Sequence, residues 1–444
     1  MPELNEPIGY SRRAVLGGIG AGSAALFGLT MAGRASAAPA SPPPPPPPPP
    51  PGLDHGVDVR KQGARGDGQT DDTAAFVRAF AQAQSSGTFL VVVPPGTYRI
   101  AQPLAAVAPI RVIGLGGEAS SVIKFDQGLA NGLTITQATS EEPFPGPAIE
   151  IQGLWFEYAG DGAALSISED GVRAPFQDTR ITGCRFHTHG NNAKGLSSVN
   201  QRSIVVAHNQ FLGSKNGTGI AVNDSDNTTI VQNVFYNLQY GIHGIRGANR
   251  EFNAGCVVLG NSMSGFQKVL FFENWETVQA VGNMLDGASQ QCVHLIDCYN
   301  SMLSDNYLGP TGSEPALLIE TSQPRGGLGQ ILFSNNYINH YAGTVGSAAI
   351  ALLGVSPQQP VDQVSITGNI VNRYPAVGIQ LRNAQNVLVS GNTLTRAAAT
   401  ATGVIAVHDE TPGANHIVHN IVDADIVADG DTVTDNFQRV PVPA

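Results

Sequence analysis

Seven ionisable side chains stand out, because the chain otherwise uses charge sparingly. Only 13% of the 444 residues are charged, which is about half the roughly 25% of an ordinary soluble domain. Paired carboxylates can act as general acid and general base, and a histidine beside a cation can remove a proton while the cation stabilises the developing negative charge. The seven residues are Asp224, His243, Arg246, Glu273, His294, Asp297 and Glu320.

Internal repetition beyond residue 140 predicts where these side chains lie. A unit of the form apolar-x-apolar-x-x-Asn-x-apolar recurs at intervals of 22–33 residues, a period typical of solenoids. Its β-branched residues, its alternation and its Gly/Asn turns favour short strands over helices. Stacked coils place the asparagines in one column, where each buried amide can bond the next. The asparagines are Asn209, Asn233, Asn261, Asn283, Asn306, Asn336, Asn369, Asn392 and Asn420.

The third strand of each coil alternates inward apolar residues with outward positions. Aligning these strands by their distance to the next asparagine predicts two outward columns and one column at the turn. The first outward column includes His243, Phe271 and His294, and the second includes Glu273, Glu320 and His408. Coils lie about 4.8 Å apart, so the backbones of Glu273 and Glu320, two coils apart, are expected to be roughly 9–10 Å apart.

These columns, their turns and the residues beside them form one predicted functional face. Asp297 lies between the two glutamates, and Trp275 and Tyr299 follow the same strands, where their rings are expected to offer apolar stacking surfaces. The alternative is that these charged residues have no function, because an exposed sheet face normally carries some charged side chains. The candidate catalytic residues are Glu273, Asp297, Glu320, His243 and His294, and the candidate binding residues are Arg246, Lys268, Trp275, Tyr299 and Asp224.

Residues 57–100 contain a distinctive order of elements. A short strand at 57–59 precedes the loop GARGDGQTDDT at 63–73, a helix with an apolar face, a buried strand at 89–93 and the turn PPGTY. This order resembles the N-terminal cap of the pectate-lyase-like superfamily, which includes pectate-lyase-3 and polygalacturonase-type proteins. Within the motif we interpret Asp67, Asp71 and Asp72 as structural residues, with Asp71 or Asp72 capping the helix.

The resemblance implies an all-β fold, a right-handed parallel β-helix of about 11 coils with a short N-terminal capping helix. It also implies a polysaccharide substrate, with uronic acids favoured. In hydrolysis, Glu273 and Glu320 are spaced near the 6.5–9.5 Å of an inverting pair. In β-elimination, His243 or His294 removes the C5 proton, and Arg246 or Lys268 neutralises the sugar carboxylate. No cofactor or metal ligand is predicted, except that a calcium ion can replace the cation in a lyase.

Part of the family pattern is missing. The paired aspartates and the Arg-Ile-Lys of polygalacturonase-type hydrolases are absent, and the nearest strings are 222–226 (VNDSD) and 241–246 (GIHGIR). A non-catalytic, glycan-binding or adhesive β-helix rod is therefore the alternative to an enzyme. Such a rod needs an aromatic-flanked face but no acid–base pair.

The first 52 residues are predicted to be an export signal followed by a spacer. Ser11–Leu16 with its twin arginines, the apolar run to Ala32 and the Ala35–Ala37 cleavage site resemble a twin-arginine (Tat) export signal over residues 1–37. Residues 38–52 form a proline-rich linker that favours polyproline II, and residues 53–440 form a single β-helix domain. We therefore expect export through the Tat machinery to the periplasm or the extracellular space.

Composition excludes several other classes. The net charge of −11 argues against a sequence-independent nucleic-acid binder, which needs a basic face. No stretch after the signal is long and apolar enough to span a bilayer. Because Tat substrates fold before export, the four cysteines need not form disulfides.

Overall fold

The computed structural model describes residues 55–117, 120–137, 146–169, 177–245, 253–322, 329–340, 348–397, 404–411, 414–428 and 430–439. All of them lie in one compact unit within Pro49–Ala444. The predicted signal peptide and proline-rich linker lie outside the described residues. Within the described residues, no helix has the length and apolar character needed to cross a membrane.

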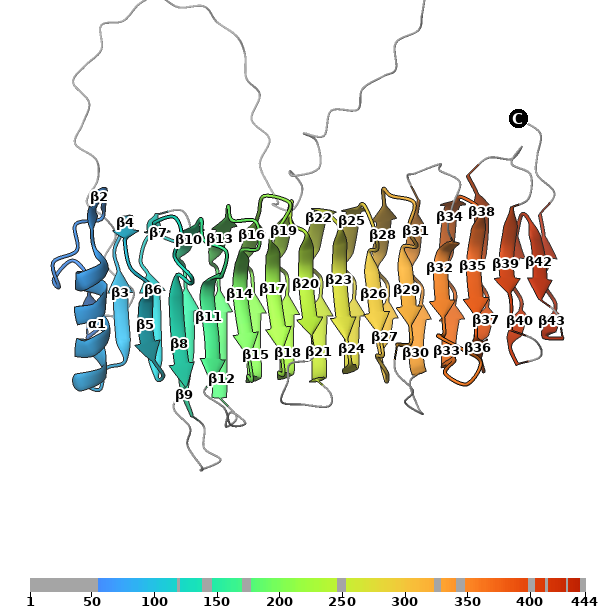
Figure 1. The fold of residues 1–444 in the computed structure, drawn as a ribbon, viewed down its shortest axis with the longest axis horizontal. Helices are drawn as coiled ribbons and strands as arrows, with labels where there is room; N and C mark the ends of the chain where they lie inside the picture. The colour runs from blue at the N-terminus through green and yellow to red at the C-terminus, as the bar shows by residue number, and fades with distance from the viewer. Residues whose placement is uncertain are drawn as a thin grey trace, which may run out of the picture. The chain divides into compact units, whose positions relative to one another are not determined.

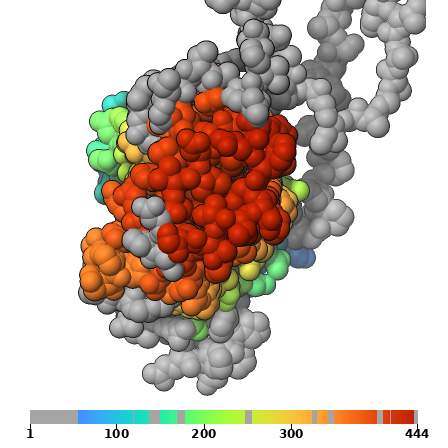
Figure 2. Space-filling model, turned by 90° about the vertical axis from the view of Figure 1, so that its right-hand side faces the viewer, coloured from blue at the N-terminus to red at the C-terminus, as the bar shows by residue number. Residues whose placement is uncertain are grey.

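Three parallel sheets run the length of this unit, and the chain visits them in turn, one strand of each per coil (Figure 1). In the part of the chain that the structure describes, the first sheet has 16 strands, the second 15 and the third 13, and consecutive strands of each sheet are hydrogen-bonded neighbours. Seen from the C-terminal end, the last coils, in red, cover the earlier ones (Figure 2). This is the architecture of an all-β parallel β-helix.

The strands of the first sheet follow the chain from end to end. They are β1 (Val57–Asp58), β3 (Leu90–Val93), β6 (Ile110–Gly114), β9 (Gly146–Gln152), β12 (Gln177–Thr182), β15 (Arg202–Ala207), β18 (Asp226–Val231), β21 (Asn253–Leu259), β24 (Trp275–Val281), β27 (Met302–Ser304), β30 (Gly329–Ser334), β33 (Val361–Thr367), β36 (Ala384–Gln385), β37 (Leu388–Ser390), β40 (His416–Val418) and β43 (Thr432–Thr434).

The second sheet contains the short strand that follows each ladder asparagine. Its strands are β2 (Asp67–Asp71), β4 (Gly96–Ile100), β7 (Ser121–Phe125), β10 (Trp155–Tyr158), β13 (Arg185–Thr188), β16 (Gln210–Leu212), β19 (Val234–Tyr236), β22 (Ser262–Phe266), β25 (Met284–Ala288), β28 (Tyr307–Pro310), β31 (Tyr337–Asn339), β34 (Ile370–Tyr374), β38 (Thr393–Arg396), β41 (Ile421–Val422) and β44 (Phe437–Gln438).

The third sheet holds the predicted functional columns. Its strands are β5 (Leu104–Val107), β8 (Leu133–Gln137), β11 (Ala163–Glu169), β14 (Lys194–Val199), β17 (Thr218–Asn223), β20 (Tyr240–Ile245), β23 (Lys268–Glu273), β26 (Val293–Ile296), β29 (Leu317–Glu320), β32 (Ala348–Leu353), β35 (Val377–Arg382), β39 (Ile405–Asp409) and β42 (Asp425–Ala428).

Two stacked columns hold the interior together. The predicted asparagine ladder is confirmed: in each step the Oδ1 of one asparagine accepts the backbone N–H and the side-chain amide of the asparagine one coil earlier, as Asn233 does from Asn209 at 2.9 and 3.0 Å. The ladder continues one step beyond the prediction, to Asn436. Beside it, stacked phenylalanines follow one another, such as Phe186 and Phe211 with ring centroids 4.8 Å apart. The four cysteines are buried, and none of them forms a disulfide within the described residues.

Helix α1 (Thr73–Ser85) contacts the first strands of the stack, β1, β3 and β5, at the blue end of Figure 1. The aspartates before it serve the local backbone. Asp71 accepts the Thr73 N–H at 3.0 Å, whereas Asp72 makes no cap bond and instead accepts the Arg65 and Gly66 N–H groups at 2.7 and 3.1 Å. These contacts give both carboxylates a structural role.

Candidate functional site

The outward face of the third sheet carries a stacked row of rings. Strand pairing places His243 beside Phe271 and Phe271 beside His294, which is the first outward column predicted from the sequence. The ring centroids are 4.7 Å apart for His243 and Phe271 and 4.9 Å apart for Phe271 and His294. Tyr240, at the start of β20, lies 4.6 Å from the His243 ring. The row therefore spans β20, β23 and β26.

A hydrogen-bonded chain of three charged or titratable side chains crosses this row. Lys268 Nζ lies 2.8 Å from His294 Nδ1, and His294 Nε2 lies 2.8 Å from Glu320 Oε2. An ammonium group has no acceptor, so Lys268 donates to Nδ1. Nδ1 is therefore the unprotonated nitrogen, and Nε2 carries the proton that it donates to Glu320. Lys268 also lies 4.3 Å from the centroid of the Phe271 ring.

The environment adjusts the ionisation of this chain. The hydrogen bond from His294 is the main cause that lowers the pKa of Glu320 below its usual range, against the opposing effect of burial. Burial lowers the pKa of Lys268, while the charges of Glu320, Glu273 and Glu314 act in the opposite direction. Glu320 is thus held as a carboxylate, with its side chain 34% exposed, whereas the His294 side chain is only 6% exposed.

Glu273 and Glu320 occupy one column, as predicted. Glu273 pairs with Ile296, and Ile296 pairs with Glu320, so the two glutamates are separated by two coils. Both side chains are half-buried. Two coil spacings correspond to roughly 9–10 Å between the backbones.

His243 differs from His294 in having no salt-bridge partner. Burial, followed by the charges of Lys268 and Lys194, lowers the pKa of His243 to about 4. Its Nε2 is buried and has no hydrogen-bond partner in the structure. His243 is therefore neutral near pH 7.

The two aspartates of the turn column, Asp224 and Asp297, occupy left-handed backbone positions. Asp224 and Asp297 are buried, at 2% and 1% exposed, and have φ angles of 50° and 51°. Asn and Asp are the non-glycine residues that most readily adopt this left-handed conformation. The Asp297 carboxylate accepts the Ser322 N–H at 2.7 Å and also the Ser322 hydroxyl. The prediction that Asp297 can serve as acid or base is corrected accordingly.

Trp275 is also corrected, because its ring is inside the β-helix. The turn residue Asn274, with φ 55°, is followed at once by β24, whose first side chain points inward. Trp275 is 0% exposed and packs edge-to-face on Phe272, with centroids 5.5 Å apart. It cannot stack on a ligand. Tyr299 is half-buried at the neighbouring turn and donates its hydroxyl to Glu276 Oε2 at 2.9 Å. Arg246 lies outside the described residues.

The alignment of the last coil also slips. His408 pairs with Gln380, which places it in the first outward column and not in the second. The predicted position was two residues off, although His408 precedes Asn420 by the same 12 residues that separate Gln380 from Asn392.

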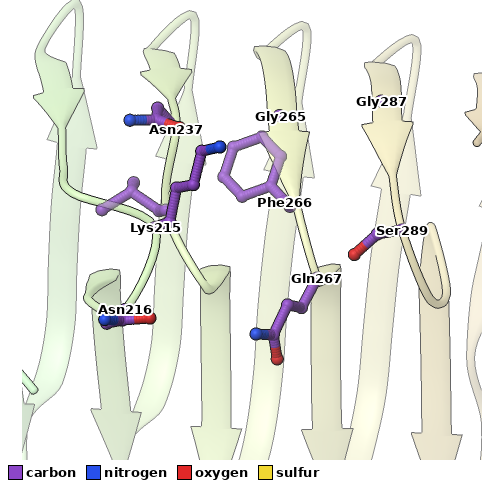
Figure 3. A pocket seen from close by; sticks show the side chains of 9 residues that line it. Lys215, Asn216, Asn237, Gly265, Phe266, Gln267, Gly287 and Ser289 are labelled. Atoms are coloured by element: carbon purple, nitrogen blue, oxygen red, sulfur yellow. The ribbon is translucent and has the colours of Figure 1, made fainter. Parts of the chain in front are cut away.

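A cleft that the sequence did not reveal adjoins the stacked row. It lies along the edge between the second and third sheets and has a volume of about 400 Å³. Figure 3 shows Lys215 extending toward the Phe266 ring, with Gln267 and Ser289 on the following coils. Gln267 immediately precedes Lys268 in the chain, so the cleft leads onto the start of the Lys268–His294–Glu320 chain. Its residues lie at the ends of second-sheet strands, such as Phe266 in β22 and Gly287 in β25, and in the turns that follow them.

Comparisons with known proteins support this architecture. The family model of rhamnogalacturonase A/epimerase, pectate lyase-like, matches residues 56–268. A comparison with curated proteins finds no match.

Three solved structures illustrate the similarity. DFA-IIIase from Arthrobacter chlorophenolicus A6, in complex with GF2, is 16% identical, with 87% of this chain and 99% of that chain covered and a TM-score of 0.53. The Agl-KA catalytic domain is 14% identical, covering 87% and 68%, with a TM-score of 0.52. Tailspike protein 3 of bacteriophage CBA120 is 16% identical, covering 83% and 62%, also with a TM-score of 0.52. These similarities show the fold of this chain, a parallel β-helix.

Proposed function

We propose that this protein is a glycoside hydrolase that binds a polysaccharide along the outward face of the third sheet. The observation that carries the proposal is the Lys268–His294–Glu320 chain, with Glu273 two coils from Glu320 in the same column. This chain holds Glu320 in its ionised form, and Glu273 provides a second carboxyl group on the same face.

In the proposed reaction, Glu320 is the general base and Glu273 the general acid. Glu320 takes a proton from water, the water oxygen attacks the anomeric carbon, and Glu273 gives its proton to the departing glycosidic oxygen. The expected backbone separation of roughly 9–10 Å is close to the 6.5–9.5 Å between carboxyl groups in inverting enzymes. His294 orients Glu320, and Lys268 fixes the tautomer of His294.

The local charge favours a neutral glycan over a uronic acid. Lys268 already interacts with the carboxylates of Glu273, Glu314 and Glu320. A sugar carboxylate placed beside Lys268 would meet these three negative charges, and like charges at close range are repulsive. This argument also disfavours β-elimination, which requires a free cation to neutralise the substrate carboxylate.

The test is a panel of neutral and uronic-acid polysaccharides, with new reducing ends measured for hydrolysis and ultraviolet absorbance of unsaturated ends for elimination. We expect reducing ends only. Glu320→Gln and Glu273→Gln are expected to lower kcat by about 10²–10⁴-fold with little change in KM. Glu410→Gln is the matched control, because Glu410 binds Gln380 farther along the same sheet.

Unsaturated products, or full activity in both variants, would contradict the proposed chemistry. Loss of activity after calcium chelation with EGTA would contradict a mechanism that uses only the side chains of this chain.

A second candidate function is glycan binding without cleavage. The rings of Tyr240 and His243, which are half-buried at one end of the stacked row, favour it, because an apolar ring face can pack on a sugar without an acid–base pair. This function predicts retention of an oligosaccharide on affinity gels with no new reducing ends, and an affinity that Glu320→Gln leaves within about twofold of the wild type.

We also propose export by the Tat pathway to the periplasm or the extracellular space. The twin arginines Arg12 and Arg13 support it. Replacing both by lysine is expected to retain the protein in the cytoplasm, as measured by immunoblotting of cell fractions. Unchanged export would contradict this route.

A further inference from the structure

A second cluster of chemistry-bearing side chains lies on the second sheet, away from the stacked row. Glu157 is in β10, and His187 is in β13 of the next coil, directly paired with Glu157. His189 follows β13 by one residue. Residues two apart along a strand point to the same face, so both imidazoles lie on the side where Glu157 lies.

The three side chains converge. His187 Nδ1 lies 3.2 Å from Glu157 Oε2, and His189 Nε2 lies 2.5 Å from Glu157 Oε1. The two imidazole rings have centroids 4.1 Å apart. One ligand atom from each of the three residues lies within 4.8 Å of the other two. In a tetrahedral site with metal–ligand distances of about 2.0–2.2 Å, ligand atoms are closer together than this, so small side-chain rotations suffice.

The surroundings leave room for a cation. Glu157 and His187 are half-buried and His189 is exposed, so an ion can enter from solvent. Arg185, the nearest cation in β13, is turned onto the Trp155 ring, 4.5 Å from its centroid. Lys124, which pairs with Glu157 from the other side, is exposed.

We propose that Glu157, His187 and His189 form a binding site for a divalent transition-metal ion, with Zn²⁺ as the representative ion. Two imidazoles and one carboxylate are a donor set that suits Zn²⁺ and disfavours Ca²⁺ and Mg²⁺, which take oxygen ligands. Three protein ligands leave the fourth tetrahedral position to water or an external ligand.

The site joins two consecutive coils. Its ligands come from β10 and β13, so a bound ion links neighbouring strands of the second sheet through their side chains. Binding to the folded chain alone stabilises it by mass action. The proposal is independent of the hydrolase, because the Lys268–His294–Glu320 chain lies on the third sheet.

Isothermal titration of the full chain with Zn²⁺ tests the proposal. We expect one Zn²⁺ per chain and a rise in Tm on binding. His187→Ala and His189→Ala are each expected to weaken binding at least tenfold. His419→Ala is the matched control, because His419 forms an exposed pair with Asp435, at 3.7 Å, without a second histidine.

Co²⁺ substitution provides a second readout that does not depend on stability. Intense visible absorption of bound Co²⁺ indicates tetrahedral coordination. We expect this absorption in the wild type and in His419→Ala but not in His189→Gln. Because His189 is exposed, its replacement is not expected to disturb folding. The proposal is overturned if Zn²⁺ does not bind, if the His187 and His189 variants bind like the control, or if Ca²⁺ binds more tightly than Zn²⁺.

Discussion

Asn306, in the middle of the ladder, provides a test of how the coils are held in register. Its Oδ1 accepts the backbone N–H and the side-chain amide of Asn283, both at 2.9 Å. Its own amide donates to the Ala280 carbonyl at 2.9 Å and to Asn336 Oδ1 at 3.0 Å. Asn306→Ala removes all four hydrogen bonds. At about 1 kcal/mol of net contribution each, the expected loss of unfolding free energy is about 4 kcal/mol.

The end of the ladder supplies the matched control. Asn436 accepts two hydrogen bonds from Asn420 and donates one to the Ile417 carbonyl at 2.8 Å, but it is only half-buried, so water can replace its partners. Asn436→Ala is therefore expected to lower the free energy of unfolding by about 1 kcal/mol, the net contribution of a single hydrogen bond.

The assay is urea unfolding followed by circular dichroism, with the midpoint and slope compared between the two variants and the wild type. Because stacked repeats can unfold in parts, the slope must be unchanged for the free energies to be compared. Equal losses for Asn306→Ala and Asn436→Ala would refute the reasoning, since burial and the number of bonds would then not determine the cost.

Three further predictions concern the ionisation of two carboxyl groups and the burial of the cysteines. If Glu320 is the base, its lowered pKa predicts that the acid limb of kcat/KM lies below the usual pKa of glutamate, and a limb near neutral pH would contradict this. Burial and then the hydrogen bond with Asp431 raise the pKa of Asp409 to about 7. The folded state therefore holds a proton that the unfolded state releases above about pH 4, so stability falls as pH rises from about 4 to about 7. Asp409→Asn should flatten the Tm–pH profile over that range. The four buried cysteines should resist DTNB at pH 8 until the chain is unfolded, and fast labelling of the native protein would show that they are accessible.

Local pattern was sufficient for the fold and for the outward columns. The alternation of inward and outward side chains in a strand has a period of two, so a correct alignment of strands places every residue on its face. The ladder asparagine of each coil provided that alignment, and His243, Phe271 and His294 pair as predicted. His408 was assigned to the wrong column, because its distance to Asn420 equals that from Gln380, and not from Arg382, to Asn392.

The predictions from the sequence that were wrong concern residues at or next to turns. The positions of Asp224 and Asp297 suggested chemistry, yet both have φ near 50°, and Asp is common there because it tolerates this backbone conformation. A residue type that suits both catalysis and a left-handed turn cannot be assigned from its column alone. Trp275 was misplaced for a related reason, since one left-handed residue before it reversed the direction of its side chain.

The sequence by itself determined that this chain is a β-helix with an ordered interior, because repeats and binary alternation are local properties. Only the tertiary structure decided which side chains touch. Lys268, His294 and Glu320 are 26 residues apart in each step, and Glu157 is 30 residues from His187. Those contacts depend on rotamers and on the exact stacking of neighbouring coils, which no spacing along the chain encodes. The catalytic proposal and the metal site both rest on these contacts between coils.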